Sequence, residues 1–159
     1  MSEEVKDYIN NILAEKRQEF GGKAVCPFAV PELQTNRLMI MTVGDNNLVD
    51  LISAFRNSDY ESALFIIEKD ISAEQTKKFQ YFVNHLLSQQ GLTDYKNICF
   101  NPNDDVDIDG YNPRSLAPYF MINIANKKVL SKAHRGLKKT NYYDKLPKKY
   151  RKFLNLKDN

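Results

Sequence analysis

The first apolar positions of this chain recur at the spacing of one face of an amphipathic helix. They are Val5, Ile9, Ile12 and Leu13. Gly21 is suited to end a helix, because glycine adopts the left-handed conformation of a C-terminal stop without strain. The pattern predicts a first helix over residues 2–20.

Two continuous apolar runs, residues 38–43 and 63–67, are too short for surface helices and predict buried strands. Between them, apolar residues recur at i, i+3, i+4 and i+7, which predicts a helix that packs on the strands. These residues are Leu48, Leu51, Ile52 and Phe55. Because a strand–helix–strand order with both strands buried is typical of parallel pairs, we expect a parallel pair joined by a right-handed crossover.

The next predicted helix opens with a capping box, in which Ser72 and Gln75 satisfy each other's main-chain N–H groups. Its apolar stripe ends before Gly91. The stripe consists of Phe79, Phe82, Val83, Leu86 and Leu87. Residues 97–100 and 119–124 then predict a third and a fourth strand.

Two helices are predicted near the end of the chain, over residues 127–137 and 148–156, where Pro147 suits a helix start. All these elements together predict an α/β fold, with α+β as the alternative, in a single domain over residues 1–159. We expect a four-stranded mixed sheet with helices packed on it, in two or three layers. A basic helical extension over about residues 127–159 would complete the domain.

The chain shows no N-terminal signal peptide and no apolar run of the roughly 18 residues that a membrane span requires. It contains two cysteines, Cys26 and Cys99. A chain of this size folds without disulfides, so we expect a reduced cytoplasmic protein with no membrane partner. The sequence predicts neither a cofactor nor an oligomeric state.

Charge is distributed very unevenly along the chain. Residues 1–126 carry a net charge of −7 and residues 127–159 a net charge of +10, although the whole chain is only at +3. One interpretation is attraction to phosphate, in nucleic acid or at a membrane surface. The other is that the lysines solvate a terminal helix and pair with the acidic body.

Two segments rich in glycine, proline and polar residues, 21–29 and 101–118, are the predicted location of a functional site. In the first, Cys26 precedes Pro27, which suits the first position of a helix. A thiol there would lie near the positive end of the backbone dipoles, which favours the thiolate and thus a nucleophilic or redox role. The alternative is a buried structural cysteine.

In the second segment, Arg114 is flanked by Pro113 and Ser115. A guanidinium held in this way suits a carboxylate or phosphate ligand. The alternative is an internal clamp, in which Arg114 pairs with Asp107 or Asp109. The acidic run before Gly110 resembles the start of a calcium loop but lacks its closing glutamate, and a short edge strand explains it equally well.

The candidate site therefore has two groups of residues. The catalytic candidates are Cys26 as nucleophile, Asp109 as proton carrier and Arg114 as anion holder. The ligand-binding candidates are Asn101, Asp107, Asn112, Ser115 and Asn123. No metal ligands are predicted, because the chain lacks clustered histidines and cysteines.

Several motifs resemble those of an uncharacterised family of small bacterial proteins of unknown function. The matching residues are Cys26-Pro27-Phe28-Ala29, Phe100-x-Pro102, Arg114-Ser115, Pro118-Tyr119 and Leu146-Pro147-Lys148-Lys149. That family carries Cys-Pro-Phe-Ala, Phe-His-Pro, Asn-Arg-Ser-Pro-Tyr-Pro and a Leu-His-Leu strand. The resemblance implies the same order of elements and the same location of the site, without naming a reaction.

This chain departs from the family's motifs at three places. Asn101 and Asn123 stand where the family has histidines, and Leu116-Ala117 is inserted after the serine. An amide neither titrates nor binds transition metals well, so chemistry that depends on those histidines is excluded here.

Three functions follow as hypotheses. The first is a small enzyme with a thiol and arginine site for a small anionic ligand. The second is a binding module whose basic C-terminal segment contacts nucleic acid or an acidic protein. The third is an accessory protein without chemistry, in which the two polar segments only close the sheet edge.

Overall fold

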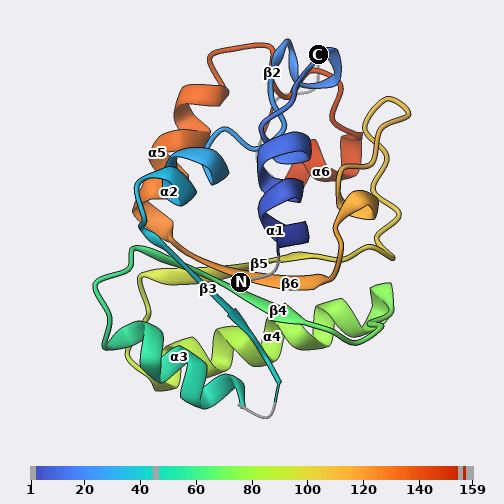
Figure 1. Cartoon of the computed structure of the whole chain (residues 1–159). Coiled ribbons are helices and arrows are strands. Elements are labelled where there is room, and N and C mark those ends of the chain that lie inside the picture. Colours follow the sequence, from blue (N-terminus) through green and yellow to red (C-terminus); the bar gives the residue numbers. More distant parts are fainter. Residues whose placement is uncertain (1–2, 45–46, 154–155, 157–159) are drawn as a thin grey trace.

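A computed structural model describes residues 3–44, 47–153 and 156. Its centre is a four-stranded mixed sheet with the strand order β3–β4–β6–β5 (Figure 1). The strands are β3 (Leu38–Thr42), β4 (Ser62–Ile67), β5 (Tyr95–Phe100) and β6 (Phe120–Asn126). β3 and β4 are parallel, as predicted, and β6 is antiparallel to both of its neighbours. The predicted α/β fold on a four-stranded mixed sheet is confirmed.

One face of the sheet is covered by α3 (Leu48–Arg56) and α4 (Ala73–Gln89), which lie below it in Figure 1. Their apolar faces form a core with the inward side chains of the strands, including Phe65 and Ile122. The capping box at Ser72 is present. Phe82 departs from the predicted stripe and is 47% exposed.

Helices also cover the other face, so the domain has three layers (Figure 1). These helices are α1 (Glu3–Asp7), its π-helical continuation η1 (Tyr8–Leu13), α2 (Ala29–Gln34), α5 (Lys127–Leu137) and α6 (Lys148–Phe153). A second core lies here, in which Tyr8 and Ile9 pack with Leu64 and Met121 of the sheet.

The first helix is shorter than predicted: it ends at Leu13 and not near residue 20. Two short strands follow, β1 (Lys16–Arg17) and β2 (Lys23–Ala24), joined through the 3₁₀ turn η2 (Gln18–Phe20). The helical spacing of apolar residues stops at Leu13. The next large apolar residue, Phe20, is buried against Tyr111 and Tyr142, contacts that no local pattern reveals.

The basic C-terminal segment packs against the body of the domain. α5 has the predicted bounds, and α6 is described from Lys148 to Phe153. Residues 154 and 155, which belong to the predicted helix over 148–156, lie outside the described residues. The Tyr142 hydroxyl donates a hydrogen bond to the Val25 carbonyl, and Arg151 donates one to the Tyr143 carbonyl (2.7 Å).

No helix in the described part of the chain combines the length and the apolar character needed to cross a bilayer.

Candidate functional site

The loop between β5 and β6 folds back on itself at Asp109-Gly110. Both residues have positive φ angles, +56° and +85°, and Ile108 and Tyr111 on either side form an antiparallel bridge. This is the arrangement of a two-residue hairpin turn, for which Asp-Gly is a favoured sequence. Val106 and Ile108 are buried, so the acidic run is a short hairpin edge and not a calcium loop.

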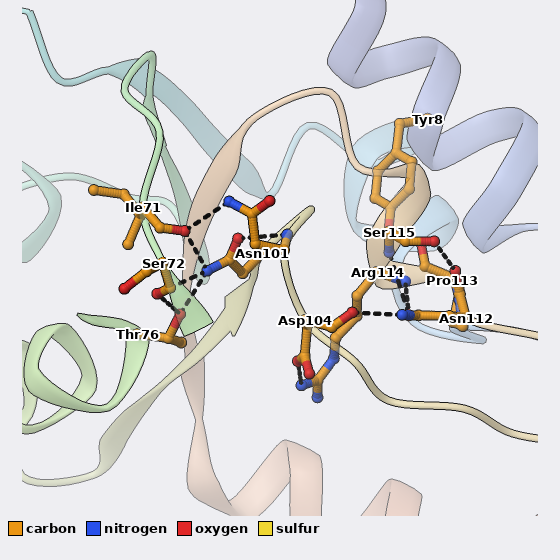
Figure 2. A network of polar contacts seen from close by, with 11 residues as sticks. Tyr8, Ile71, Ser72, Thr76, Asn101, Asp104, Asn112, Pro113, Arg114 and Ser115 are labelled. Carbon is orange, nitrogen blue, oxygen red and sulfur yellow. Dashed lines mark hydrogen bonds and ion pairs between the residues drawn. The ribbon is translucent and has the colours of Figure 1, made fainter. Parts of the chain in front are cut away.

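Arg114 is engaged within this loop. It lies in the short 3₁₀ turn η3 (Arg114–Leu116), and its Nη1 donates to Asp104 Oδ2 across 2.6 Å (Figure 2). The pair is partly buried, with 35% and 18% of the two side chains exposed. The alternative of an internal clamp therefore describes this arginine, with Asp104 as the partner in place of Asp107 or Asp109.

Asn112 organises the same turn. Its Oδ1 accepts hydrogen bonds from the main-chain N–H groups of Arg114 and Ser115, and its Nδ2 donates to the Asp104 carbonyl (2.6 Å). The Ser115 hydroxyl donates back to the Asn112 carbonyl (2.8 Å), as Figure 2 shows. These two predicted ligand-binding residues satisfy one another within the loop.

The two aspartates also have internal partners. Asp107 Oδ1 accepts the Gly110 N–H across 2.6 Å, which supports the hairpin turn. Asp109 pairs with Lys145 of the C-terminal segment, also at 2.6 Å. Both carboxylates thus fix the shape of the loop and its contact with residues that follow α5.

Asn101 is 1% exposed and joins the end of β5 to the start of α4. Its Nδ2 donates to the Ile71 carbonyl (2.9 Å) and to Thr76 Oγ1 (2.7 Å), and its Oδ1 accepts the Asn103 N–H (2.8 Å) (Figure 2). It also borders a surface cavity of about 250 Å³. That cavity is lined by residues 67–71, 101–103 and 118–120.

Cys26 and Asn123 lie elsewhere, at a smaller hollow of about 80 Å³ between η1, α2 and the sheet. Cys26 is partly exposed and Asn123 is half-buried. Glu32 of α2 borders the same hollow, and its Oε2 accepts a hydrogen bond from the Ser62 hydroxyl (2.8 Å). The pattern of residues did not single out Glu32. A carboxylate between apolar neighbours, here Val30, Pro31 and Leu33, is the sequence signal that could have indicated Glu32.

The thiol of Cys26 is not activated as the sequence predicts. α2 begins at Ala29, three residues after Cys26, and is only one and a half turns long. Burial raises the pKa of the Cys26 thiol above its ordinary value, against the opposing effect of the Phe28 and Ala29 main chain. Burial raises the pKa of the Cys99 thiol to about 12. Neither cysteine is held as a thiolate at neutral pH.

The predicted site residues therefore occupy three places: the hairpin loop, the junction of β5 with α4, and the hollow at Cys26. Neither cavity described here is lined by both Cys26 and Arg114. Among the described residues, no three His, Cys, Asp or Glu side chains are grouped so that they could hold a metal ion.

A fourth feature is the outer face of α5. The inner face, Leu130, Ala133, His134 and Leu137, is partly buried, and the outer residues are exposed. The cations of that outer face are Lys128, Lys132 and Arg135, followed by Lys138 and Lys139 in the turn that ends the helix. Within the described part of the chain, Lys128, Lys132, Arg135 and Lys139 form no ion pair with a carboxylate.

Comparison with protein-family models, with curated proteins and with solved structures gave no significant match to this chain.

Proposed function

We propose that this protein is a nucleic-acid-binding module that contacts the phosphate backbone through the outer face of α5. The observation that carries the proposal is the row formed by Lys128, Lys132, Arg135 and Lys139. The spacing of four and three residues puts Lys128, Lys132 and Arg135 on one side of α5, and Lys139 follows in the turn that ends the helix. Four exposed cations without carboxylate partners are free to exchange counterions for phosphates.

The length of the row suits a polyanion better than a small anion. Lys128 to Arg135 span about 10 Å along α5, and Lys139 extends the row beyond the end of the helix, so the row is longer than one phosphate group. The remainder of the chain is acidic, with a net charge of −7 over residues 1–126. That charge repels a polyanion, so it favours an approach from the α5 side.

The row has few groups that read bases. Lysine contacts phosphate as a point charge, and Arg135 is the one arginine in the row. Ser131 and Gly136, also on the outer face, are small and leave room for a backbone to approach. We therefore propose binding that depends on the backbone and is largely independent of sequence.

The segment that carries the row is held in place. The His134 ring contacts Tyr143 through a hydrogen bond of 2.7 Å, and Lys145 pairs with Asp109. A row fixed on a folded surface loses less conformational entropy on binding than a disordered basic tail does.

The contacts of Arg114 favour this function over the thiol and arginine enzyme. An anionic ligand at Arg114 must compete with Asp104 at 2.6 Å, whereas the four cations of the row have no carboxylate to displace among the described residues. The thiol of Cys26 also lacks the lowered pKa that a nucleophile needs.

The test is fluorescence anisotropy with a labelled 20-base-pair duplex and a labelled 20-nucleotide single strand. We expect dissociation constants of about 1–100 μM near physiological salt, the range of backbone binding, for more than one sequence. Polyglutamate, added as a competitor, distinguishes a nucleic acid from an acidic protein as the partner. If polyglutamate displaces the labelled nucleic acid at equal charge, the row is assigned to an acidic protein partner. Absence of nucleic-acid binding and of polyglutamate binding at 50 mM salt would refute both proposed partners.

A further inference from the structure

Asn123 occupies an unusual position for a polar side chain. It lies in β6, the third strand of the sheet order, with Leu64 of β4 and Ile98 of β5 directly opposite on its two sides. Apolar residues are the rule at such a position, because an amide that is withdrawn from water needs partners. Within the described part of the chain its side chain makes one long hydrogen bond, from Nδ2 to the Ala63 carbonyl at 3.4 Å.

The amide borders the 80 Å³ hollow, which is mostly apolar. Its walls include Ile9, Leu38, Phe100, Met121 and Leu130. Its polar side chains are those of Tyr8, Cys26, Glu32 and Asn123. The Tyr8 hydroxyl donates to the Pro113 carbonyl (2.9 Å) and Glu32 accepts from Ser62, whereas Asn123 is the group that still offers both a donor and an acceptor.

The charges around the hollow determine what it can hold. Among the residues that the structure describes, no lysine, arginine or histidine lines it, and Glu32 would repel an anion. The small anionic ligand expected beside Cys26 therefore does not match these walls. The Cys26 thiol is neutral and most of the walls are apolar, so bringing a charged group into the hollow would cost its hydration, and the surroundings favour an uncharged guest.

Size limits the guest further. A cavity of about 150 Å³ holds benzene, so a hollow of about 80 Å³ suits a molecule of roughly three to five non-hydrogen atoms. A primary amide offers a donor and an acceptor side by side, which complement the acceptor and donor of the Asn123 amide.

We propose that this hollow is a binding site for a small neutral molecule with an amide or carbonyl group, which hydrogen-bonds to Asn123 and places its apolar part between η1 and the sheet. This inference is independent of the α5 surface, since none of the four cations of the row lines the hollow.

The test uses acetamide as the probe and alkylation of Cys26 by dilute iodoacetamide as the readout, with peptide mass spectrometry to separate Cys26 from Cys99. A guest in the hollow blocks access to the Cys26 thiol. With a dissociation constant of about 1 mM, 10 mM acetamide slows the labelling of Cys26 about tenfold. Acetate and ethylammonium, of similar size but charged, should protect much less.

Two variants locate the site. Asn123→Leu removes the hydrogen-bonding partner and Ala29→Leu fills the hollow, and both should abolish protection by acetamide. Asn103→Ala, at the other cavity, should leave protection unchanged. Saturation-transfer NMR of acetamide on the unmodified protein gives a readout that needs no variant. The proposal is overturned if acetamide neither protects Cys26 nor receives saturation at 50 mM, or if acetate protects equally.

Discussion

Arg114 and Asp104 form an ion pair of 2.6 Å within one loop, ten residues apart in the chain. The pair closes the base of a hairpin whose tip is Asp109-Gly110. Since Asn112 also bonds to the Asp104 carbonyl, two side chains hold the same residue. This relationship accounts for the density of polar residues in the segment without invoking a ligand.

Removing the Arg114–Asp104 pair should lower the free energy of unfolding only slightly. Because about a third of the arginine side chain is exposed, solvent weakens the attraction, and we expect a coupling free energy of about 1 kcal/mol. The measurement is a double-mutant cycle of Asp104→Asn and Arg114→Gln by urea denaturation. A coupling near zero would show that the pair does not hold the loop.

Asn101 should contribute more to the free energy of unfolding than the Arg114–Asp104 pair does. It is 1% exposed, and its removal leaves the Asn103 N–H without its partner and takes one of two donors from the Ile71 carbonyl. We expect Asn101→Ala to lower the free energy of unfolding by about 2 kcal/mol. Asn103→Ala, at a more exposed position, is the control and should cost about 1 kcal/mol or less. Equal losses for the two variants would contradict this account.

Cys26 should react with iodoacetamide faster than Cys99, because it is partly exposed while Cys99 is 1% exposed. Its pKa is raised, so the thiolate fraction grows only at high pH. The labelling rate of Cys26 should therefore still rise above pH 9, where a free cysteine approaches its plateau. A plateau below pH 8 would show an activated thiol and revive the nucleophile hypothesis.

Glu32 makes stability depend on pH in a defined direction. Its pKa is raised in the folded protein by burial, so the folded state binds the proton more tightly than the unfolded state does. The stabilisation is complete below the unfolded pKa of about 4.5 and is lost as the pH rises through the folded pKa. Glu32→Gln should thus gain stability relative to wild type between pH 4.5 and pH 7. A constant difference over that range would contradict the raised pKa.

The fold could be predicted where local patterns and tertiary packing agree. α3, α4 and α5 carry helical spacing or caps in their own residues, and β3 and β4 are short apolar runs. The end of the first helix could not be predicted, because Phe20 is held by Tyr111 and Tyr142, about a hundred residues away.

The partner of Arg114 was within reach of the sequence. Asp109-Gly110 is a hairpin signal, and the register of the Ile108–Tyr111 bridge, continued along both arms, brings Asp105 opposite Arg114 and Asp104 next to it. The separation of Cys26 from Arg114 could not be predicted from the sequence, since it depends on how η1 and α2 pack over the sheet. The free hydrogen-bonding capacity of Asn123 likewise emerges only from that packing, whereas Glu32 carries a sequence signal, a carboxylate among apolar neighbours.

The salt dependence of duplex binding tests the central claim most directly. A variant with Gln at Lys128, Lys132, Arg135 and Lys139 is compared with a control that replaces Lys69, Lys77, Lys78 and Lys96 by Gln and loses the same charge. With four phosphate contacts, wild type and control should lose roughly 100-fold in affinity between 50 and 200 mM salt. The α5 variant should bind at least tenfold more weakly at 50 mM with a slope near zero. Equal affinity and slope for the two variants would contradict a phosphate-binding surface on α5.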